Sequence, residues 1–367
     1  MSRLAVHQML PSFSYGDAIG NHVLLIREIL RSWGYASEVF AKHVHPRLQG
    51  MTRPFRSFAE HAGPDCPLIF HFSIGSEVVD YWATLKNPTL LVYHNITPPE
   101  YFRGVNARVA QKCARGREVL RSLVPRVSLA AGVSEYNRQE LESMGFRDTG
   151  VLPLGVNPEA LKRRPNRRML RRFADGRVTV LHVGRIAPNK RIEDILRVFY
   201  FYQHKINPYS RLLLVGTDVD MENYAFALRE LADDFRLREV RFLGHVTQEE
   251  LNACYRLAHV YLCLSEHEGF CVPLVEAMHF DIPVVAYAAG GVPETLGGAG
   301  MLVHEKRYPE LAELLDLLVR DKKLRHRVLD VQRQRLQHFH VSSVAKALQE
   351  LLERLQRSRG QQQGDAA

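Results

Sequence analysis

The sequence has few of the residues and runs that define several common classes of protein. Its five cysteines are Cys66, Cys113, Cys254, Cys263 and Cys271, without a Cys-x-x-Cys pair or metal-ligand spacing to a histidine. No apolar run approaches the ~20 residues that a membrane-spanning helix needs, and the first residues lack the pattern of a secretory leader. We therefore expect a reduced, cytosolic protein, with any membrane contact peripheral to the inner face of the plasma membrane.

Two nucleotide-binding motifs are also missing. The second half has no Gly-x-x-x-x-Gly-Lys-Ser/Thr loop, and no Gly-x-Gly-x-x-Gly follows a predicted strand. These absences argue against phosphate binding by a P-loop and against a dinucleotide oxidoreductase. A looser glycine loop, Gly16 to Gly20, opens a helix after the first predicted strand. Its backbone amides either approach a ligand closely or form an ordinary turn.

The charge is unbalanced towards the basic side. Over 367 residues the formal net charge is +9, and seven lysines and arginines crowd the stretch from Lys162 to Arg172. Such an excess attracts anionic partners, among them nucleic acid, anionic lipid and phosphorylated substrates. For the basic stretch we weigh a solvated helix or linker face against an attraction to an anionic membrane surface.

Strands and helices alternate along the whole chain, with a break near the middle. The predicted strands are Leu4–Leu10, Tyr35–Ala41, Leu68–Phe72, Thr89–Tyr93, Val127–Ala131, Val178–Val183, Arg211–Val215, Val240–Leu243, His259–Leu264 and Ile282–Tyr287. Strands that are apolar on both faces are typical of parallel sheets covered by helices. The sequence therefore predicts an α/β protein with two Rossmann-like parallel-sheet domains that face a central cleft.

The turn-rich segment that begins at Leu152 and the basic stretch after it mark the predicted domain boundary. We expect an N-terminal domain over residues 1–157 and a C-terminal domain over residues 175–340. A last helix, at about residues 341–358, carries apolar residues on one face and is expected to pack back on the first domain. Residues 359–367 are expected to form a disordered tail.

Two spaced carboxylates, Asp218 and Asp220, follow a predicted strand. They could hold a divalent metal on a diphosphate, but an aspartate at such a position commonly caps the next helix. We favour the helix cap, and we predict no metal site.

The segment from Ser265 to Glu276 is the most informative in the chain. It follows a predicted strand, and Pro273 suits the first turn of a helix. The amides of Phe270 and Cys271 would then lie at a helix N-terminus, which attracts anions. Glu268 precedes that helix and Glu276 lies about one turn into it. Two carboxylates that face one pocket are good acceptors for the vicinal hydroxyls of a sugar.

A second loop, from Gly184 to Lys190, also follows a predicted strand. Arginine binds phosphate through two donors and lysine acts as a point charge, so Arg185 and Lys190 could neutralise a leaving diphosphate without a metal. The alternative is that these two cations pair with acids in a strand-to-helix loop.

In this combination the sequence resembles glycosyltransferase family 4. The resemblance rests on the Glu-x7-Glu pair at Glu268 and Glu276, on the Gly184–Lys190 loop and on the segment from Ala289 to Glu294. It covers the second domain, and in the first domain it extends to the Gly16 loop and to Tyr93-His94-Asn95. The resemblance implies the GT-B fold and a reaction that retains the anomeric configuration.

The resemblance also implies roles for individual residues. Glu276 would bind the ribose of a nucleotide, Glu268 would face the donor sugar, and Arg185 and Lys190 would hold the diphosphate. Gly16 would let the first-domain loop approach the phosphates, and His94 would lie near the donor sugar, although a histidine at a strand end is otherwise an ordinary hydrogen-bonded residue. The residues predicted to take part in catalysis are Arg185, Lys190, Glu268 and His94, and those predicted to bind substrate are Gly16, Gly269, Phe270, Cys271 and Glu276.

Two positions depart from the family pattern. Cys271 stands where the family often has glycine, so we expect the loop to do without glycine's extra conformations. Asp281 also replaces a glycine, but aspartate tolerates the left-handed region, so we expect that turn to persist.

We therefore expect a metal-independent hexosyltransferase that needs no cofactor. It would use a UDP- or GDP-sugar and act on a glycan or lipid-linked acceptor in the synthesis of cell-surface polysaccharide or glycolipid. The alternatives are a sugar-nucleotide epimerase or a glycan phosphorylase of the same fold, and a basic nucleic-acid-binding protein. No helix-turn-helix or zinc spacing supports the last of these, so we predict no nucleic-acid partner.

Overall fold

The computed structural model describes residues 4–156 and 158–364, which form two compact units. The first unit consists of residues 1–99, 111–156 and 339–367, and the second of residues 100–110 and 157–338. The short segment 100–110 thus clusters with the second unit, which the sequence did not suggest. Residue 157, the predicted end of the first domain, lies outside the described residues.

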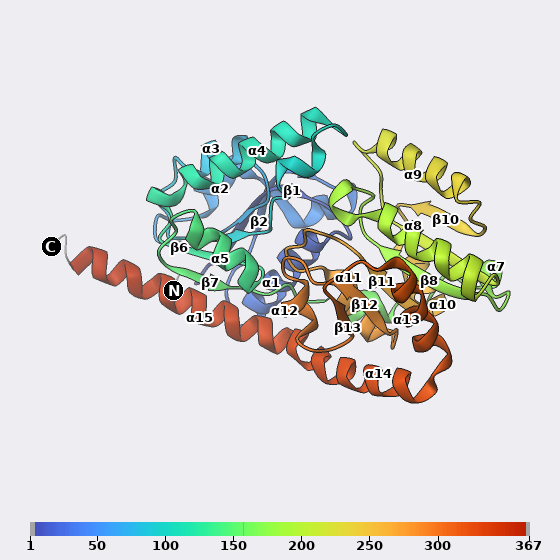
Figure 1. Cartoon of the computed structure of the whole chain (residues 1–367). Coiled ribbons are helices and arrows are strands. Elements are labelled where there is room, and N and C mark those ends of the chain that lie inside the picture. The colour runs from blue at the N-terminus through green and yellow to red at the C-terminus, as the bar shows by residue number, and fades with distance from the viewer. Residues whose placement is uncertain (1–3, 157, 365–367) are drawn as a thin grey trace. The chain divides into compact units, whose positions relative to one another are not determined.

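The first unit is built on a seven-stranded sheet with the strand order β3-β2-β1-β4-β5-β6-β7 (Figure 1). Every neighbouring pair is parallel. The strands are β1 (His7–Phe13), β2 (Val39–Val44), β3 (Thr52–Pro54), β4 (Leu68–Phe72), β5 (Thr89–Tyr93), β6 (Leu129–Gly132) and β7 (Thr149–Val151). Both β4 and β5 are buried along their whole length, so neither strand has an exposed face, as expected of strands covered on both sides.

The helices of the first unit connect these strands. They are α1 (Ala18–Ser32), η1 (Pro46–Met51), η2 (Phe55–Ser57), α2 (Phe58–His61), α3 (Glu77–Trp82), η4 (Val124–Arg126), α5 (Glu135–Ser143) and α15 (Val341–Gly364). Helix α4 (Ala107–Ser122) begins in the second unit and ends in the first, and η3 (Pro99–Phe102) also lies at this junction in the chain.

Strand β1 extends further than the sequence predicts. The predicted strand ends before Pro11, but β1 continues to Phe13 and includes this proline. β1 pairs with β4 only as far as Met9, whereas its pairing with β2 continues to Phe13. A proline without an N–H is tolerated where one side of a strand has no partner, which explains the error.

The second unit has a six-stranded sheet with the order β10-β9-β8-β11-β12-β13, again parallel throughout. The strands are β8 (Val178–Val183), β9 (Ser210–Val215), β10 (Val240–Gly244), β11 (Val260–Cys263), β12 (Val284–Tyr287) and β13 (Met301–Val303). The helices are α6 (Pro158–Lys162), α7 (Arg167–Phe173), η5 (Pro188–Lys190), α8 (Ile192–Phe201), η6 (Tyr202–Ile206), α9 (Glu222–Asp234), α10 (Gln248–Leu257), α11 (Val272–His279), α12 (Val292–Leu296), α13 (Tyr308–Arg320), α14 (Lys322–Leu336) and η7 (Gln337–Phe339).

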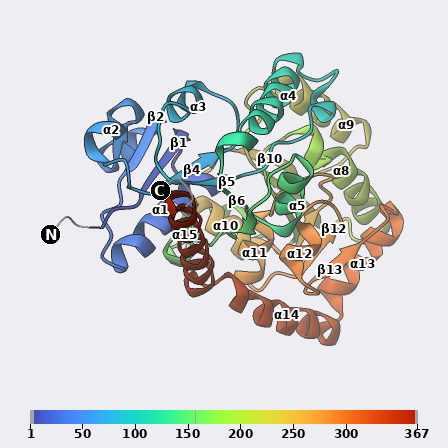
Figure 2. The ribbon, with the colours of Figure 1, turned by 90° about the vertical axis from the view of Figure 1, so that its left-hand side faces the viewer.

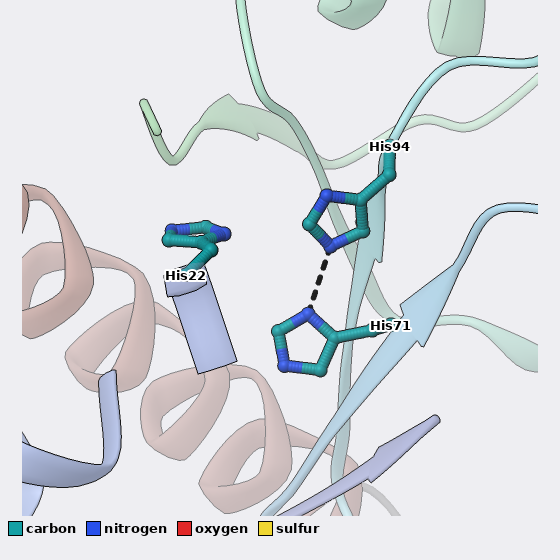
Figure 3. A group of neighbouring side chains, drawn as sticks. All are labelled: His22, His71 and His94. Carbon is teal, nitrogen blue, oxygen red and sulfur yellow. Dashed lines mark hydrogen bonds between the residues drawn. The ribbon is translucent and has the colours of Figure 1, made fainter. Parts of the chain in front are cut away.

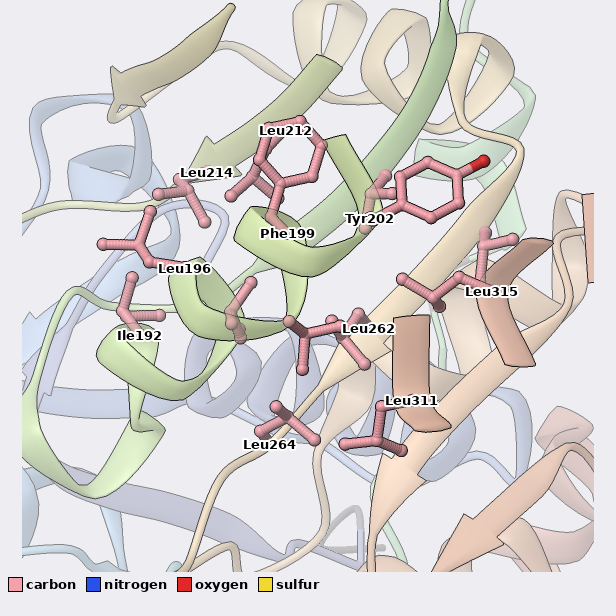
Figure 4. Packing of buried hydrophobic residues seen from close by; sticks show 14 of the residues in the cluster. Ile192, Leu196, Phe199, Tyr202, Leu212, Leu214, Leu262, Leu264, Leu311 and Leu315 are labelled. Atoms are coloured by element: carbon pink, nitrogen blue, oxygen red, sulfur yellow. The ribbon is translucent and has the colours of Figure 1, made fainter. Parts of the chain in front are cut away.

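One face of this second sheet is covered by α8 and α13. Apolar residues of α8 such as Leu196 pack against Leu212 of β9 and Leu262 of β11, and α13 adds Leu311 and Leu315 (Figure 4). All of these side chains are buried. The core holds the carboxyl ends of β8 and β11 in fixed positions, and these ends carry the candidate site.

The C-terminal helix α15 belongs to the first unit and contacts α1, β5 and β6. Both views of the ribbon show it beside α1 (Figures 1 and 2). Its apolar face is buried, as predicted, through Val344, Leu348, Leu351, Leu352 and Leu355. Arg354 adds a hydrogen bond to the Thr149 carbonyl at 2.8 Å.

The sequence interpretation missed β3, β7 and β13, which have three residues each and are too short to show a period. The predicted disordered tail is also wrong in part, because α15 continues to Gly364. Residues 365–367 of that tail lie outside the described residues.

Candidate functional site

An ion pair between Lys190 and Glu268 lies at the centre of the candidate site in the second unit. The Lys190 Nζ is 2.6 Å from Glu268 Oε1 and 2.7 Å from Oε2. The two side chains are only 19% and 8% exposed. Burial alone would lower the pKa of Lys190, but the Glu268 carboxylate outweighs it and raises that pKa. Burial would raise the pKa of Glu268, and Lys190 reverses this in the same way. Both groups are therefore charged at neutral pH.

Sheet topology explains why residues 78 positions apart meet. β8 and β11 are neighbours in the sheet and run parallel, so their carboxyl ends lie side by side. Lys190 ends η5, in the loop after β8, and Glu268 lies in the loop after β11. Loops that leave the same edge of a parallel sheet are where open α/β sheets bind ligands.

The loop that carries Glu268 is held through its backbone on several sides. Asn189, which is buried, donates from Nδ2 to the His267 carbonyl at 3.0 Å. The backbone N–H of Gly291 donates to the Glu268 carbonyl at 2.8 Å. The Thr295 hydroxyl donates to the Phe270 carbonyl at 2.5 Å. The loop is thus positioned before any ligand arrives, which favours precise recognition.

Gly290 allows the closest of these approaches. A Cβ at this position would lie 2.2 Å from the Glu268 carbonyl oxygen, and the backbone φ of +55° is left-handed. Only glycine satisfies both conditions without strain. The Ala289–Glu294 segment therefore acts as a support for the backbone of Glu268.

A buried carboxylate, Asp194, supports the other side of the same loop. It accepts from Lys306 Nζ at 2.8 Å, and the same ammonium lies 2.8 Å from Glu266 Oε1. The Tyr308 hydroxyl also donates to Asp194, at 2.9 Å. Burial would raise the pKa of Asp194, but its hydrogen bond with Lys306 and the nearby positive charges hold that pKa below its usual value.

Cys271 corrects an expectation about this loop. It adopts a left-handed conformation, with φ +69° and ψ +65°, immediately before α11. The loop therefore keeps the backbone shape that glycine favours, although the residue is cysteine. Gly269 and Phe270 are buried next to it. Pro273 lies in the first turn of α11, as predicted.

Glu276 lies on α11 and is held by a tyrosine. The Tyr255 hydroxyl donates to Glu276 Oε2 at 2.6 Å, and Tyr255 stacks on Phe280 with ring centroids 5.1 Å apart. Burial raises the pKa of Glu276 above its usual value. The sequence reasoning found Glu276 but missed Tyr255, because no local motif links the two residues.

Arg185 forms its contacts outside the Lys190–Glu268 pair. It donates to the Val219 carbonyl at 2.7 Å, and it lies 4.0 Å from an Asp220 carboxylate oxygen. The expected helix cap at this point is wrong, because α9 has Met221 at its N-cap and no side-chain cap bond. Asp218 instead pairs with Arg229 at 3.3 Å.

Two predicted site residues lie in the first unit. Gly16 has a left-handed φ of +82°, and Asp17 after it caps α1 by accepting from the Gly20 N–H at 2.6 Å. His94 directly follows β5, and its Nε2 lies 2.9 Å from Nδ1 of His71.

Asp281, the second departure from the family pattern, has a φ of +55°, so its turn persists as expected.

Two groups of side chains in the described ranges bring potential metal ligands together. One is His22, His71 and His94, and the other is Cys263, Glu268 and Cys271; within each group the ligand atoms lie within 4.8 Å of one another. Both carboxylate oxygens of Glu268 already accept hydrogen bonds from Lys190.

Among the described helices, none is both long and apolar enough to cross a membrane.

Solved structures share the fold of the chain. The Anabaena protein HepE in complex with UDP-glucose matches with a TM-score of 0.73 and 18% identity, over 96% of this chain and 99% of that one. Sucrose-phosphate synthase from Thermosynechococcus elongatus matches with a TM-score of 0.74 and 20% identity, over 96% and 100% of the two chains. These likenesses confirm the predicted GT-B fold class, with its two parallel-sheet α/β domains.

The second unit carries the family signature. Residues 164–335 match the family model described as glycosyl transferases group 1. The predicted resemblance is thereby confirmed.

Relatives with similar sequences match this chain over a limited length. Trehalose synthase from Thermococcus litoralis is 30% identical over 184 residues, 47% of this chain and 44% of the relative. A GDP-mannose-dependent alpha-(1-6)-phosphatidylinositol monomannoside mannosyltransferase from Mycobacterium tuberculosis is 27% identical over 221 residues, 56% of each chain. The chain thus matches about half the length of these relatives.

Gly290→Ala is expected to destabilise the second unit by about 2 kcal/mol or more, because the new Cβ must displace the backbone of Glu268. Gly298→Ala is the matched control, since Gly298 also has a left-handed φ, of +86°, but open space around it. That control should cost about 1 kcal/mol. Urea unfolding of both variants measures the difference, and equal losses would contradict the role of close approach at Gly290.

Asp194→Asn is expected to lower the free energy of unfolding by about 2 to 3 kcal/mol at neutral pH, since Lys306 loses its buried counter-charge. The pKa of Asp194 is lowered in the folded state from 3.8, so the stabilisation is present above that pH and is lost as the pH falls below it. The difference between wild type and variant should therefore shrink in acid. Asp330→Asn, which removes an exposed paired acid, should cost less than about 0.5 kcal/mol. A difference for Asp194→Asn that does not change with pH would contradict this account.

Proposed function

We propose that this protein is a retaining glycosyltransferase that moves a hexosyl group from a UDP- or GDP-sugar to an acceptor hydroxyl. The Lys190–Glu268 pair at the carboxyl edge of the second sheet, inside a group 1 glycosyl transferase segment, carries the proposal. Two of the matched proteins support a nucleotide-sugar donor: one relative is GDP-mannose-dependent, and one structural neighbour was solved with UDP-glucose.

The donor would bind along the loop from Glu268 to α11. The N-terminal amides of α11 and the ammonium of Lys190 favour a diphosphate. Glu276, with Oε2 occupied by Tyr255, would accept ribose hydroxyls through its other oxygen. The Glu268 carboxylate would accept hydrogen bonds from hydroxyls of the donor sugar. The hydrogen bonds to the backbone of its loop keep this carboxylate in place.

The arrangement disfavours Glu268 as a nucleophile. Both of its oxygens accept from the Lys190 ammonium, which lowers the reactivity of the carboxylate. An ammonium has three donors, and Glu268 uses two of them, so the third remains for a phosphate oxygen. In the proposed front-face reaction the bond from the sugar to the diphosphate breaks as the acceptor oxygen attacks on the same face. The leaving diphosphate, stabilised by Lys190 and Arg185, takes the proton of the acceptor hydroxyl. We propose that no metal or other cofactor takes part.

The acceptor is proposed to be a glycan or lipid-linked sugar at a membrane surface. All seven basic residues of the 162–172 stretch are exposed. Lys162 and Arg163 pair with Glu159 and Glu249, whereas α7 places four arginines, Arg167, Arg168, Arg171 and Arg172, in one short helix. Such a helix is attracted to anionic lipid headgroups.

The Arg185→Ala/Lys190→Ala variant is expected to lose transfer by on the order of 10³-fold or more, because the leaving diphosphate loses both cations. The assay is transfer from a panel of UDP- and GDP-hexoses, with the anomer of the product read by NMR and with a chelator present throughout. Product that forms without an acceptor would indicate an epimerase. A double variant that transfers at the wild-type rate would contradict the assigned roles.

The control must separate chemistry from folding, because Lys190→Ala leaves Glu268 buried and unpaired. The neutral pair Lys190→Met/Glu268→Gln removes both charges together and should fold, yet it should still fail in transfer. Lys205→Ala/Arg320→Ala removes two basic residues outside the site and should retain activity.

Changing Arg167, Arg168, Arg171 and Arg172 to glutamine is expected to abolish flotation with liposomes that contain anionic lipid, since about 1 kcal/mol per basic residue is lost. Wild type should float with these liposomes and not with neutral ones, and added salt should weaken the effect. Wild-type flotation that is independent of anionic lipid would refute membrane attraction.

A further inference from the structure

Two buried histidines of the first unit, His22 and His71, lie together with the half-buried His94 where β4 and β5 end. His71 belongs to β4, His94 follows β5, and His22 comes from α1, which contacts this sheet (Figure 3). The ring of His22 stands nearly perpendicular to those of His71 and His94, with centroids 6.1 and 5.6 Å away. The sequence resemblance implies a role only for His94, near a donor sugar, so the reason for the other two must be sought in their contacts.

Sheet register places a glutamine in the same row. Gln8 of β1 pairs with Ile69 of β4, and His71 is two residues further along β4, on the same face. His71 in turn pairs with Val92 of β5, and His94 is two residues beyond Val92. The polar side chains therefore step diagonally across three neighbouring strands, from β1 to the end of β5.

The orientation of the Gln8 amide is set by its own partner. Gln8 donates from Nε2 to the Val23 carbonyl at 3.0 Å, and Oε1 lies 3.0 Å from His71 Nε2. The reversed amide would place its oxygen against the Val23 carbonyl, which has no donor. Gln8 must therefore accept at Oε1, so Nε2 of His71 carries a hydrogen.

The same logic carries over to His94. Burial holds the pKa of His71 and of His94 well below the usual value, and burial lowers the pKa of His22 to about 3, so all three rings are neutral at pH 7. A neutral His71 with hydrogen on Nε2 has a bare Nδ1. Its contact with His94 Nε2, at 2.9 Å, then requires His94 to donate. The Nδ1 of His94 is left bare, buried and without a partner among the described residues.

A metal ion is a weaker explanation of this group. Three imidazole nitrogens within 4.8 Å would suit a zinc-like cation. However, the two nitrogens that lie closest together already share a hydrogen, and no carboxylate belongs to the group. The hydrogen-bonded chain accounts for every nitrogen of His71 and for Nε2 of His94.

We propose that Gln8 and His71 are positioning residues that hold His94 as the neutral tautomer with hydrogen on Nε2, so that its Nδ1 accepts a hydrogen bond from a sugar hydroxyl. The choice of a hydroxyl as ligand rests on the proposed function. The positions of the hydrogens on His71 and His94 follow from the hydrogen bonds alone and do not rest on it. A bare, buried acceptor is stabilised when a donor arrives, and a hydroxyl is such a donor. His94 with hydrogen on Nδ1 could not accept there, and its bare Nε2 would face the bare Nδ1 of His71 at 2.9 Å with no hydrogen between them.

The direct test is NMR of the full chain labelled with ¹⁵N-histidine. Long-range proton–nitrogen correlations distinguish a protonated from a bare ring nitrogen, and the His94→Gln and His71→Gln variants assign the signals. We expect both rings to be neutral, with hydrogen on Nε2, from pH 6 to 8. Hydrogen on Nδ1 of either ring, or a stoichiometric metal bound to these histidines, would overturn the proposal whether or not the protein transfers sugars.

Variants of Gln8 test the positioning role. Gln8→Met keeps the length of the side chain but removes the acceptor, so the Nδ1–H tautomer of His94 should become populated and kcat should fall about tenfold or more, with a smaller change in KM. Burial favours the neutral acid in Gln8→Glu, which can donate to the Val23 carbonyl and accept from His71, so this variant should restore the Nε2–H tautomer and most of kcat. Gln203→Met removes another buried glutamine, one that donates to the Arg238 carbonyl, and should leave tautomers and kcat unchanged. A Gln8→Met variant with the wild-type tautomers would overturn the proposal.

Discussion

The buried ion pair between Lys190 and Glu268 is the interaction on which the candidate site depends. A buried carboxylate or ammonium alone would be costly, so each group stays charged only because the other is present. This mutual dependence requires the loops after β8 and β11 to meet at one edge of the sheet, with little freedom to separate. The neighbouring features are consistent with that need, since Asn189, Gly291 and Thr295 all bind the backbone of the Glu268 loop.

The two units use different physical means to prepare their polar groups. In the second unit, opposite charges keep each other ionised, and Lys306 is shared between Asp194 and Glu266. In the first unit, burial keeps the histidines neutral, and hydrogen-bond direction decides where their protons lie. One unit thus presents charge to a ligand, and the other presents an uncharged acceptor.

Left-handed backbone conformations recur around the site. Gly16 and Gly290 have them, which is expected of glycine, but Cys271 has one as well. A cysteine in this region costs about 1 kcal/mol relative to glycine. Cys271 is buried next to Cys263, with their sulfur atoms 3.9 Å apart, and the packing of its side chain offsets part of that cost.

The sequence by itself determined the α/β class, most strands, and the positions of Glu268, Glu276 and Lys190 in loops or helices after strands, because hydrophobic period and turn residues are local signals. Short strands such as β13 could not be predicted, because three residues are too few to show a hydrophobic period. Only the tertiary structure decided which side chains meet. It paired Lys190 with Glu268 and Tyr255 with Glu276, and it turned Arg185 towards Val219 instead. It also joined Gln8, His71 and His94 through strand order and register, which no spacing along the chain encodes.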